Sequence, residues 1–163
     1  MSESVDPLVK ITRVPERGAY DKESIYSTFD DGYLCHVAYE SDHGPVVLPT
    51  LYGRHENFIY FHGSPAAGMF RRANSDVNIS LVVTHVDGFV LARSLFHHSM
   101  NYRSVVVIGK AEKVEDPKEV MHGLEVITEN CLPGRWDEAR QPNDVELRQT
   151  TVFRLELTAA SVK

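Results

Sequence analysis

The sequence has little of what marks a secreted, membrane-spanning or nucleic-acid-binding protein. Its 163 residues include only two cysteines, Cys35 and Cys131, which are far apart, and we interpret them as buried reduced thiols of a cytoplasmic protein. No apolar run approaches the length of a membrane-spanning helix, and the N-terminus lacks a signal peptide's apolar stretch. The net charge of -6 argues against a nucleic-acid partner. A composition of 42% hydrophobic and 25% charged residues is typical of a globular domain.

Short apolar segments separated by turn residues fill most of the chain. They predict strands at residues 33–39, 45–52, 57–62, 76–85, 89–94, 102–114 and 150–157. Asp87-Gly88 predicts a tight hairpin between two of these strands. Helices are expected at residues 21–31, at 65–73 after a Ser64-Pro65 start, and at 117–132 after a capping Asp116.

The gaps between these strands are too short for most parallel crossovers, so the sequence predicts a mainly β (α+β) fold. An antiparallel barrel with a few short peripheral helices fits best, because closure pairs the edges of the apolar strands. We expect the barrel domain to span residues 21–163 and residues 1–20 to form an N-terminal arm.

Polar side chains crowd the start of the strand at 102–114, where Arg103 and Ser104 precede an apolar run. Such groups cost about 1–3 kcal/mol each if they are buried without partners. Two interpretations stay open: a polar ligand is bound here, or the strand end simply faces solvent. A phosphate is the favoured ligand, because the Ser64-Pro65 helix start would offer unpaired amides that Arg103 and Ser104 could complement.

Five motifs strengthen this interpretation. They are RGAYD at 17–21, LCHV at 34–37, VLPT at 47–50, YFHGS at 60–64 and MNYRSV at 100–105. In this order they resemble the flavin-nucleotide-binding split-barrel proteins of the pyridoxamine 5'-phosphate oxidase-like superfamily, and more narrowly the nitroimidazole-reductase-like branch. The resemblance runs from about Ile11 to the last residue. Because members commonly continue further, it implies that a C-terminal segment is absent from this chain.

The resemblance implies an FMN-binding split barrel that forms a homodimer, with the flavin in a cleft at the subunit interface. Residues 48–51 would run beside the isoalloxazine ring, Tyr60, His62 and Ser64 would line the ribityl and phosphate side, and Arg103 and Ser104 would bind the phosphate. The implied cofactor-binding residues are therefore Leu48, Pro49, Thr50, Leu51, Tyr60, His62, Ser64, Arg103 and Ser104. No catalytic side chain is implied, because the cofactor performs the chemistry.

The sequence departs from the family pattern at one place. Relatives usually carry a Lys or Arg four or five residues after the His of the Tyr-Phe-His motif, whereas this chain has PAAGM at 65–69 and its first basic residues are Arg71 and Arg72. Arg103 is therefore expected to hold the phosphate with less help than in relatives.

The expected function is that of an oxidoreductase that passes electrons from a reduced nicotinamide to a small acceptor such as a nitro compound. One alternative is a flavin carrier or sensor without turnover. Another is a haem-binding split barrel, for which His97 and His98 are candidate ligands among eight histidines. We expect no metal site, because adjacent histidines on a strand point to opposite faces and no acidic cluster completes a ligand set. Trp136 is expected to pack the loop after the last helix.

Overall fold

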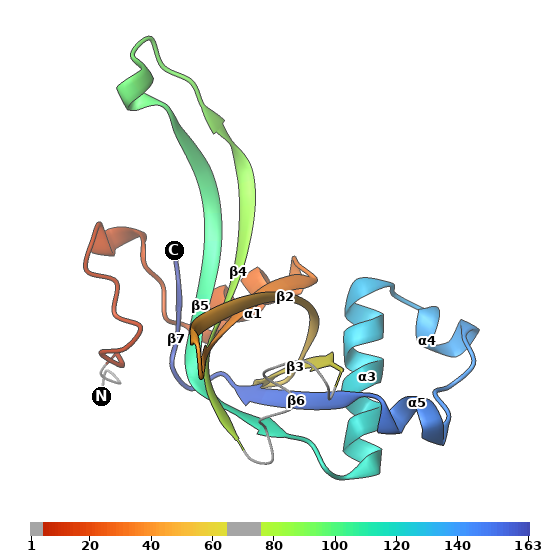
Figure 1. Cartoon of the computed structure of the whole chain (residues 1–163). Helices are drawn as coiled ribbons and strands as arrows, with labels where there is room; N and C mark the ends of the chain where they lie inside the picture. Colours follow the sequence, from red (N-terminus) through yellow and green to blue (C-terminus); the bar gives the residue numbers. More distant parts are fainter. Residues whose placement is uncertain (1–4, 65–75) are drawn as a thin grey trace.

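The computed structural model describes residues 5–64 and 76–163. The chain forms one antiparallel sheet that curls into a barrel, with one long helix on its outside and a two-stranded projection (Figure 1). The strands are β1 (Leu34–Ser41), β2 (Gly44–His55), β3 (Phe58–Gly63), β4 (Val77–Val90), β5 (Ser99–Lys113), β6 (Thr151–Glu156) and β7 (Ala160–Val162). The helices are α1 (Lys22–Asp30), α3 (Pro117–Cys131), α4 (Arg135–Glu138) and α5 (Asp144–Arg148).

The strand order explains why the sheet closes on itself. It runs β4-β1-β2-β3-β6-β5-β7, and β4 also pairs with β5, so six strands form a ring to which β7 is added. Every pairing between these strands is antiparallel. The predicted antiparallel split barrel is therefore confirmed. Among the described residues, no helix combines the length and apolarity needed to cross a membrane.

The barrel interior is filled by side chains that alternate along each strand. In β1, for example, Cys35, Val37 and Tyr39 are buried while His36 is exposed, as period-two patterning requires. Helix α1 closes one end of the barrel, and its Phe29 is fully buried. The result is one large apolar core inside the ring.

Helix α3 covers the outer side of β2, β3 and β6 and forms a second, smaller apolar cluster there. It begins at Pro117 after Asp116, whose carboxylate accepts a hydrogen bond from the Lys118 amide. The helix approaches β2 at Gly53, where an added Cβ would lie 2.4 Å from the Val126 carbonyl oxygen. Only glycine permits this approach of the helix to the sheet.

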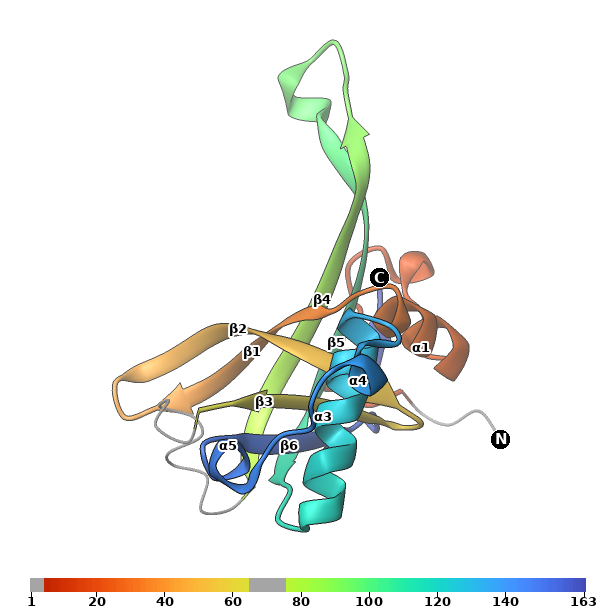
Figure 2. The same cartoon turned by 90° about the vertical axis from the view of Figure 1, so that its right-hand side faces the viewer.

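Beyond the ring, β4 and β5 continue as a two-stranded projection that we call the finger, residues 84–104. Figures 1 and 2 show that it extends away from the barrel. The predicted hairpin at Asp87-Gly88 is wrong, because β4 continues to Val90 and the pair forms a bulge in the ladder. The Asp87 carboxylate accepts hydrogen bonds from Arg103 on the opposite strand, so it stabilises continued pairing instead of a turn.

The chain reverses at residues 91–98, where Leu95–His97 forms a 3-10 turn. The strand predicted at 89–94 therefore ends at Val90. Helices α1 and α3 are confirmed, and the helix predicted at 65–73 lies outside the described residues. Strand β7 and helices α4 and α5 had no counterpart in the prediction. Ala19 forms an isolated bridge with Val162, so the N-terminal segment is tied to β7.

Candidate functional site

The four β2 residues predicted beside the flavin ring point alternately into and out of the barrel. Leu48 packs against the core, whereas Pro49 and Leu51 are exposed. The Thr50 hydroxyl donates a hydrogen bond to the His62 carbonyl oxygen at 3.1 Å and so links β2 to β3. Tyr52 pairs with Phe61, so Leu51, the residue before Tyr52, lies opposite His62, the residue after Phe61, and both point away from the core.

On β3, Tyr60 points outward to α3. The residue is 5% exposed, and its hydroxyl donates to Glu119 Oε1 at 3.4 Å. Burial raises the pKa of Tyr60, and the neighbouring Glu119 carboxylate adds to the effect. Ser64 is exposed and is the last described residue before 65–75, so the helix start predicted there lies outside the described residues.

His62 faces a cavity of about 330 Å³ on the outer side of the barrel. Nδ1 of its ring is buried and has no hydrogen-bond partner in the part of the chain that the structure describes. Burial lowers the pKa of His62, so the ring is held neutral at pH 7. The cavity is lined by β3, α3 and the segment that carries α4 and α5, through His62, Leu124, Ile127, Thr128, Trp136, Arg140, Pro142, Glu146 and Thr150.

An ion pair stands among the residues that line this cavity. Arg140 donates to both carboxylate oxygens of Glu146, at 2.7 and 3.1 Å. Arg140 and the Asn143 amide lower the pKa of Glu146 to about 2. Asn143 and Glu146 also form a capping box at the start of α5, which fixes the position of this carboxylate. An apolar wall, an indole, a neutral imidazole and a guanidinium therefore meet in one hollow, which suits a planar aromatic ligand with polar edges.

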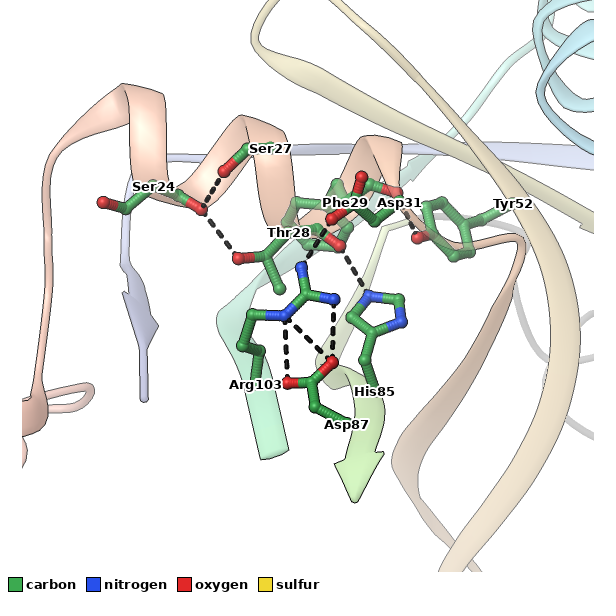
Figure 3. A network of polar contacts seen from close by, with 9 residues as sticks. All are labelled: Ser24, Ser27, Thr28, Phe29, Asp31, Tyr52, His85, Asp87 and Arg103. Atoms are coloured by element: carbon green, nitrogen blue, oxygen red, sulfur yellow. Dashed lines mark hydrogen bonds and ion pairs between the residues drawn. The ribbon is translucent and has the colours of Figure 1, made fainter. Parts of the chain in front are cut away.

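Arg103 lies elsewhere, at the root of the finger, and it is held by two carboxylates (Figure 3). Its Nη1 donates to Asp31 Oδ2 at 2.5 Å, and its Nη2 donates to Asp87 Oδ1 at 3.0 Å. Arg103 lowers the pKa of Asp87. Beside it, His85 Nε2 donates to the Thr28 carbonyl oxygen at 2.8 Å. Together these contacts join the end of α1 to both strands of the finger.

Ser104 points to the opposite side of β5 from Arg103, since adjacent strand residues alternate. Its amide donates to the Lys163 carbonyl oxygen at 2.7 Å. In the ring, β5 is three strands away from β2 in either direction. Within one chain the structure thus brings together the predicted residues of β2 and β3, and it leaves Arg103 and Ser104 on the far side of the barrel.

The sequence interpretation missed several residues of the cavity. Arg140 and Glu146 were not singled out, although Asn143 followed three residues later by Glu146 is a capping-box signature that could have located α5. Trp136 was expected only to pack its loop, and it lines the cavity. The carboxylate partners of Arg103 were also missed, because Asp87 was assigned to a turn.

A family model for pyridoxamine 5'-phosphate oxidase matches residues 21–163. The chain belongs to this family. The resemblance inferred from the five motifs is thereby confirmed. Comparison with curated protein sequences finds no significant match.

Solved structures in this family resemble the chain closely. The flavocytochrome Anf3 from Azotobacter vinelandii is 31% identical with a TM-score of 0.88, and the match covers 97% of this chain and 73% of that one. A FAD- and haem-binding protein from Mycobacterium smegmatis is 30% identical with a TM-score of 0.83, covering 90% and 72% of the two chains. A protein described as conferring 5-nitroimidazole antibiotic resistance, from Bacteroides thetaiotaomicron, shares the fold at 24% identity and a TM-score of 0.69, covering 89% and 84%.

Proposed function

We propose that this chain binds a flavin nucleotide and is an oxidoreductase that passes electrons from a reduced nicotinamide to a small acceptor such as a nitro compound. Membership of the pyridoxamine 5'-phosphate oxidase family supports a flavin as the cofactor. FMN is the form that the sequence motifs favour. The FAD-binding relative makes FAD the alternative to test beside it.

The observation that carries the proposal is His62, which lines the cavity and whose buried Nδ1 has no hydrogen-bond partner among residues 5–64 and 76–163. A buried polar atom without a partner costs about 1–3 kcal/mol, which a ligand can recover by hydrogen bonding. The cavity, at about 330 Å³, lies within the size range of ligand pockets. Leu51 on β2 lies across from His62, since Tyr52 pairs with Phe61. The residues present therefore fit one end of a flavin.

When bound, a flavin supplies hydride and single-electron transfer, and the protein supplies position and charge. His62, held neutral by burial, would accept or donate a hydrogen bond at Nδ1. Trp136 and the apolar residues of α3 would exclude water from one side of the ligand. Arg140 would add positive charge there, offset by Glu146 in the present arrangement.

We further propose that the flavin site is shared between two copies of the chain. The predicted ring residues on β2 and the predicted phosphate residues on β5 lie on opposite sides of one barrel. A flavin at the interface of two protomers would contact the β2 residues of one and the β5 residues of the other. This separation supports the homodimer with the flavin at its interface that the motifs imply.

Flavin titration tests the binding. The purified protein should be yellow or should shift the absorbance of added FMN or FAD. His62→Ala should weaken binding about tenfold, the value of one lost hydrogen bond in a desolvated site. His43→Ala is the matched control, since His43 lies exposed in the β1–β2 turn, and it should leave binding unchanged. A colourless protein that shifts neither spectrum would refute the proposal.

Turnover separates an oxidoreductase from a carrier or sensor. The flavin-loaded protein should oxidise a reduced nicotinamide faster than the same concentration of free flavin does. Stoichiometric flavin binding with oxidation at the free-flavin rate would favour the non-catalytic alternative.

The phosphate assignment has its own test. Arg103→Ala should weaken flavin binding more than Arg71→Ala does. Arg103 is already paired with Asp31 and Asp87, so Asp87→Asn should tighten binding if a phosphate competes for this guanidinium. If Arg71→Ala has the larger effect, the phosphate binds at the segment 65–75 instead.

A haem-binding function is the second candidate, supported by two relatives of at least 30% identity that carry haem. The candidate ligands His97 and His98 lie at the tip of the finger, both exposed. Haem titration should give a Soret band that His97→Ala or His98→Ala shifts. A band that neither variant alters would exclude these two residues as ligands.

A further inference from the structure

The segment that carries α4 and α5, residues 132–150, lies against α3 with little packing of its own. Figure 1 shows it outside the barrel, beside α3. Neither α4 nor α5 contains a buried residue, and segments with few buried side chains open at low free-energy cost. The segment supplies five of the nine residues that line the His62 cavity, namely Trp136, Arg140, Pro142, Glu146 and Thr150. Whatever holds the segment in place therefore also shapes that cavity.

One carboxylate of α3 holds the start of α4. Glu129 Oε2 accepts a hydrogen bond from the Gly134 amide at 2.6 Å, and Oε1 accepts one from the Trp136 amide at 2.7 Å. In the described part of the chain, these are the two side-chain hydrogen bonds that join the segment to α3. Bonds between an ionised acceptor and an amide are shorter and about twice as strong as bonds between neutral groups. The Gly134 amide, followed by the Trp136 amide, lowers the pKa of Glu129, so the carboxylate is ionised at neutral pH.

The residue that precedes α4 explains why this helix needs a carboxylate from elsewhere. The first amides of a helix lack partners within the helix, and a capping side chain normally satisfies them. Here the capping position is occupied by Gly134, which has no side chain to offer and whose φ of 83° fits the chain reversal after Pro133. Helix α5, in contrast, follows Asn143, whose own side chain caps it. Glu129 supplies the missing cap of α4 from the preceding helix.

Glu129 itself stands on a fixed part of α3. The neighbouring Asn130 donates hydrogen bonds from Nδ2 to the carbonyl oxygens of Gly32 at 2.8 Å and Tyr52 at 3.0 Å. This end of the helix is thereby tied to β2 and to the turn between α1 and β1. The Glu129 carboxylate therefore positions Trp136 relative to the barrel, and not merely relative to α3.

We propose that Glu129 is a positioning residue of the His62 cavity: its carboxylate holds the start of α4 so that the Trp136 indole forms one wall and packs against a planar ligand bound there. Glu129 does not line the cavity, so it acts on the ligand through Trp136. That the ligand is a flavin rests on the proposed function, whereas the hold of Glu129 on Trp136 does not. Without the carboxylate, we expect the segment to move away from α3 and expose the indole to water.

Trp136 is the chain's single tryptophan, so its fluorescence reports the position of the segment directly. In the flavin-free protein, Glu129→Ala should shift the emission to longer wavelength and increase its quenching by acrylamide, because the indole becomes more exposed. Glu125→Ala is the matched control: Glu125 lies exposed one turn earlier on α3, and this variant should have the emission of the wild type. Circular dichroism checks that each variant is folded.

The variant Glu129→Gln separates positioning of Trp136 from helix formation. Its amide oxygen can accept one of the two hydrogen bonds, so its emission and quenching should lie between those of the wild type and Glu129→Ala. Alanine is the better helix former. A role in the stability of α3 alone would therefore leave the indole no more exposed in Glu129→Ala than in Glu129→Gln, and this result would contradict the proposal.

Flavin affinity tests whether the positioned indole contacts the ligand. Trp136→Ala should weaken binding of the flavin that the wild type takes about fivefold, the value of one aromatic contact. Glu129→Ala should cost nearly as much, and the double variant Glu129→Ala/Trp136→Ala should bind no more weakly than Trp136→Ala alone. Losses that do not add indicate two residues that act through one contact.

The proposal is overturned if Glu129→Ala leaves the emission and quenching of Trp136 unchanged, if Glu125→Ala changes them equally, or if the losses of flavin affinity add. A wild type that binds neither FMN nor FAD would refute the proposed function instead. The fluorescence comparison, which needs no flavin, would still decide whether Glu129 holds Trp136.

Discussion

The barrel interior and the finger are built from the same residue types, yet they differ in what covers them. Phe61 on β3 is fully buried, while Phe89 on β4 is 80% exposed. Both strands carry apolar side chains in a β pattern and both pair antiparallel. The difference arises because the ring supplies a second layer of side chains to Phe61 and nothing in the described chain supplies one to Phe89. An apolar strand pattern therefore indicates pairing, and the surrounding topology decides burial.

The largest expected effect separates these two phenylalanines. Phe61→Ala should lower the free energy of unfolding by about 3–5 kcal/mol, because it leaves a cavity in a packed core. Phe89→Ala should change protomer stability by less than about 0.5 kcal/mol. Urea denaturation of the two variants and the wild type measures both changes. Equal losses would contradict the contrast between barrel and finger.

Two glycines offer a second comparison between the regions. Gly53→Ala should destabilise by about 1–3 kcal/mol, since its Cβ would meet the Val126 carbonyl oxygen and push α3 off the sheet. Gly88→Ala in the finger meets nothing within 4 Å. Its melting temperature should match that of the wild type. If Gly88→Ala lowered the melting temperature as much as Gly53→Ala does, other atoms would have to pack closely around Gly88, contrary to the structure.

His62, on the outside of the barrel, should have a smaller effect on stability, which depends on pH. Its pKa lies below the ordinary value of 6.5 because burial disfavours the charged ring. The unfolded chain then binds more protons, so stability falls as pH drops from 6.5 through the lowered pKa. His62→Gln should flatten this part of the profile, whereas exposed His43→Gln should not. The check is the free energy of unfolding measured from pH 5 to 8 without flavin.

The smallest effect is expected at the root of the finger, where the charges are exposed. Arg103 lowers the pKa of Asp87 below 3.8, so this pair stabilises the fold above pH 3.8 and the contribution is lost as pH falls through the lowered value. Arg103→Gln should therefore be less stable than wild type at pH 6, and the two should converge near pH 2. Curves that stay parallel down to pH 2 would show that Asp87 is not stabilised by Arg103.

Much of the barrel could be predicted because its strands satisfy a local rule. Residues 33–39 alternate inward and outward as a half-buried strand should, and β1 is found there. The hairpin predicted at Asp87-Gly88 was wrong because turn preferences are local. The bulge found there depends on Arg103, which is 16 positions away and binds the Asp87 carboxylate. The exposure of Phe89 could not be predicted, since it follows from where β1 and β7 stop.

The motifs named Thr50 and His62, and the structure brings the two together, since the Thr50 hydroxyl donates to the His62 carbonyl oxygen. That they bind a flavin stays a prediction. The cavity depends on how α4 and α5 fold back beside α3. Helices of four and five residues are too short for a periodic sequence pattern to predict them. Whether Arg103 meets a phosphate also depends on a second chain, which a single sequence does not specify.

The closed ring has a consequence for how the chain folds during synthesis. Strand β6 pairs with β3, where Glu156 lies opposite Phe58, and it also pairs with β5, so the ring stays open until β6 has been made. Before then, β3 and the end of β5 at residues 111–113 have unpaired edges, and the core side chains face water. Both conditions favour aggregation. The β4–β5 hairpin, by contrast, needs only nearby residues and can form early. A ribosome-bound chain stalled before residue 151 should therefore carry a formed finger on an unfinished barrel, and it is the stage at which this protein most needs a chaperone.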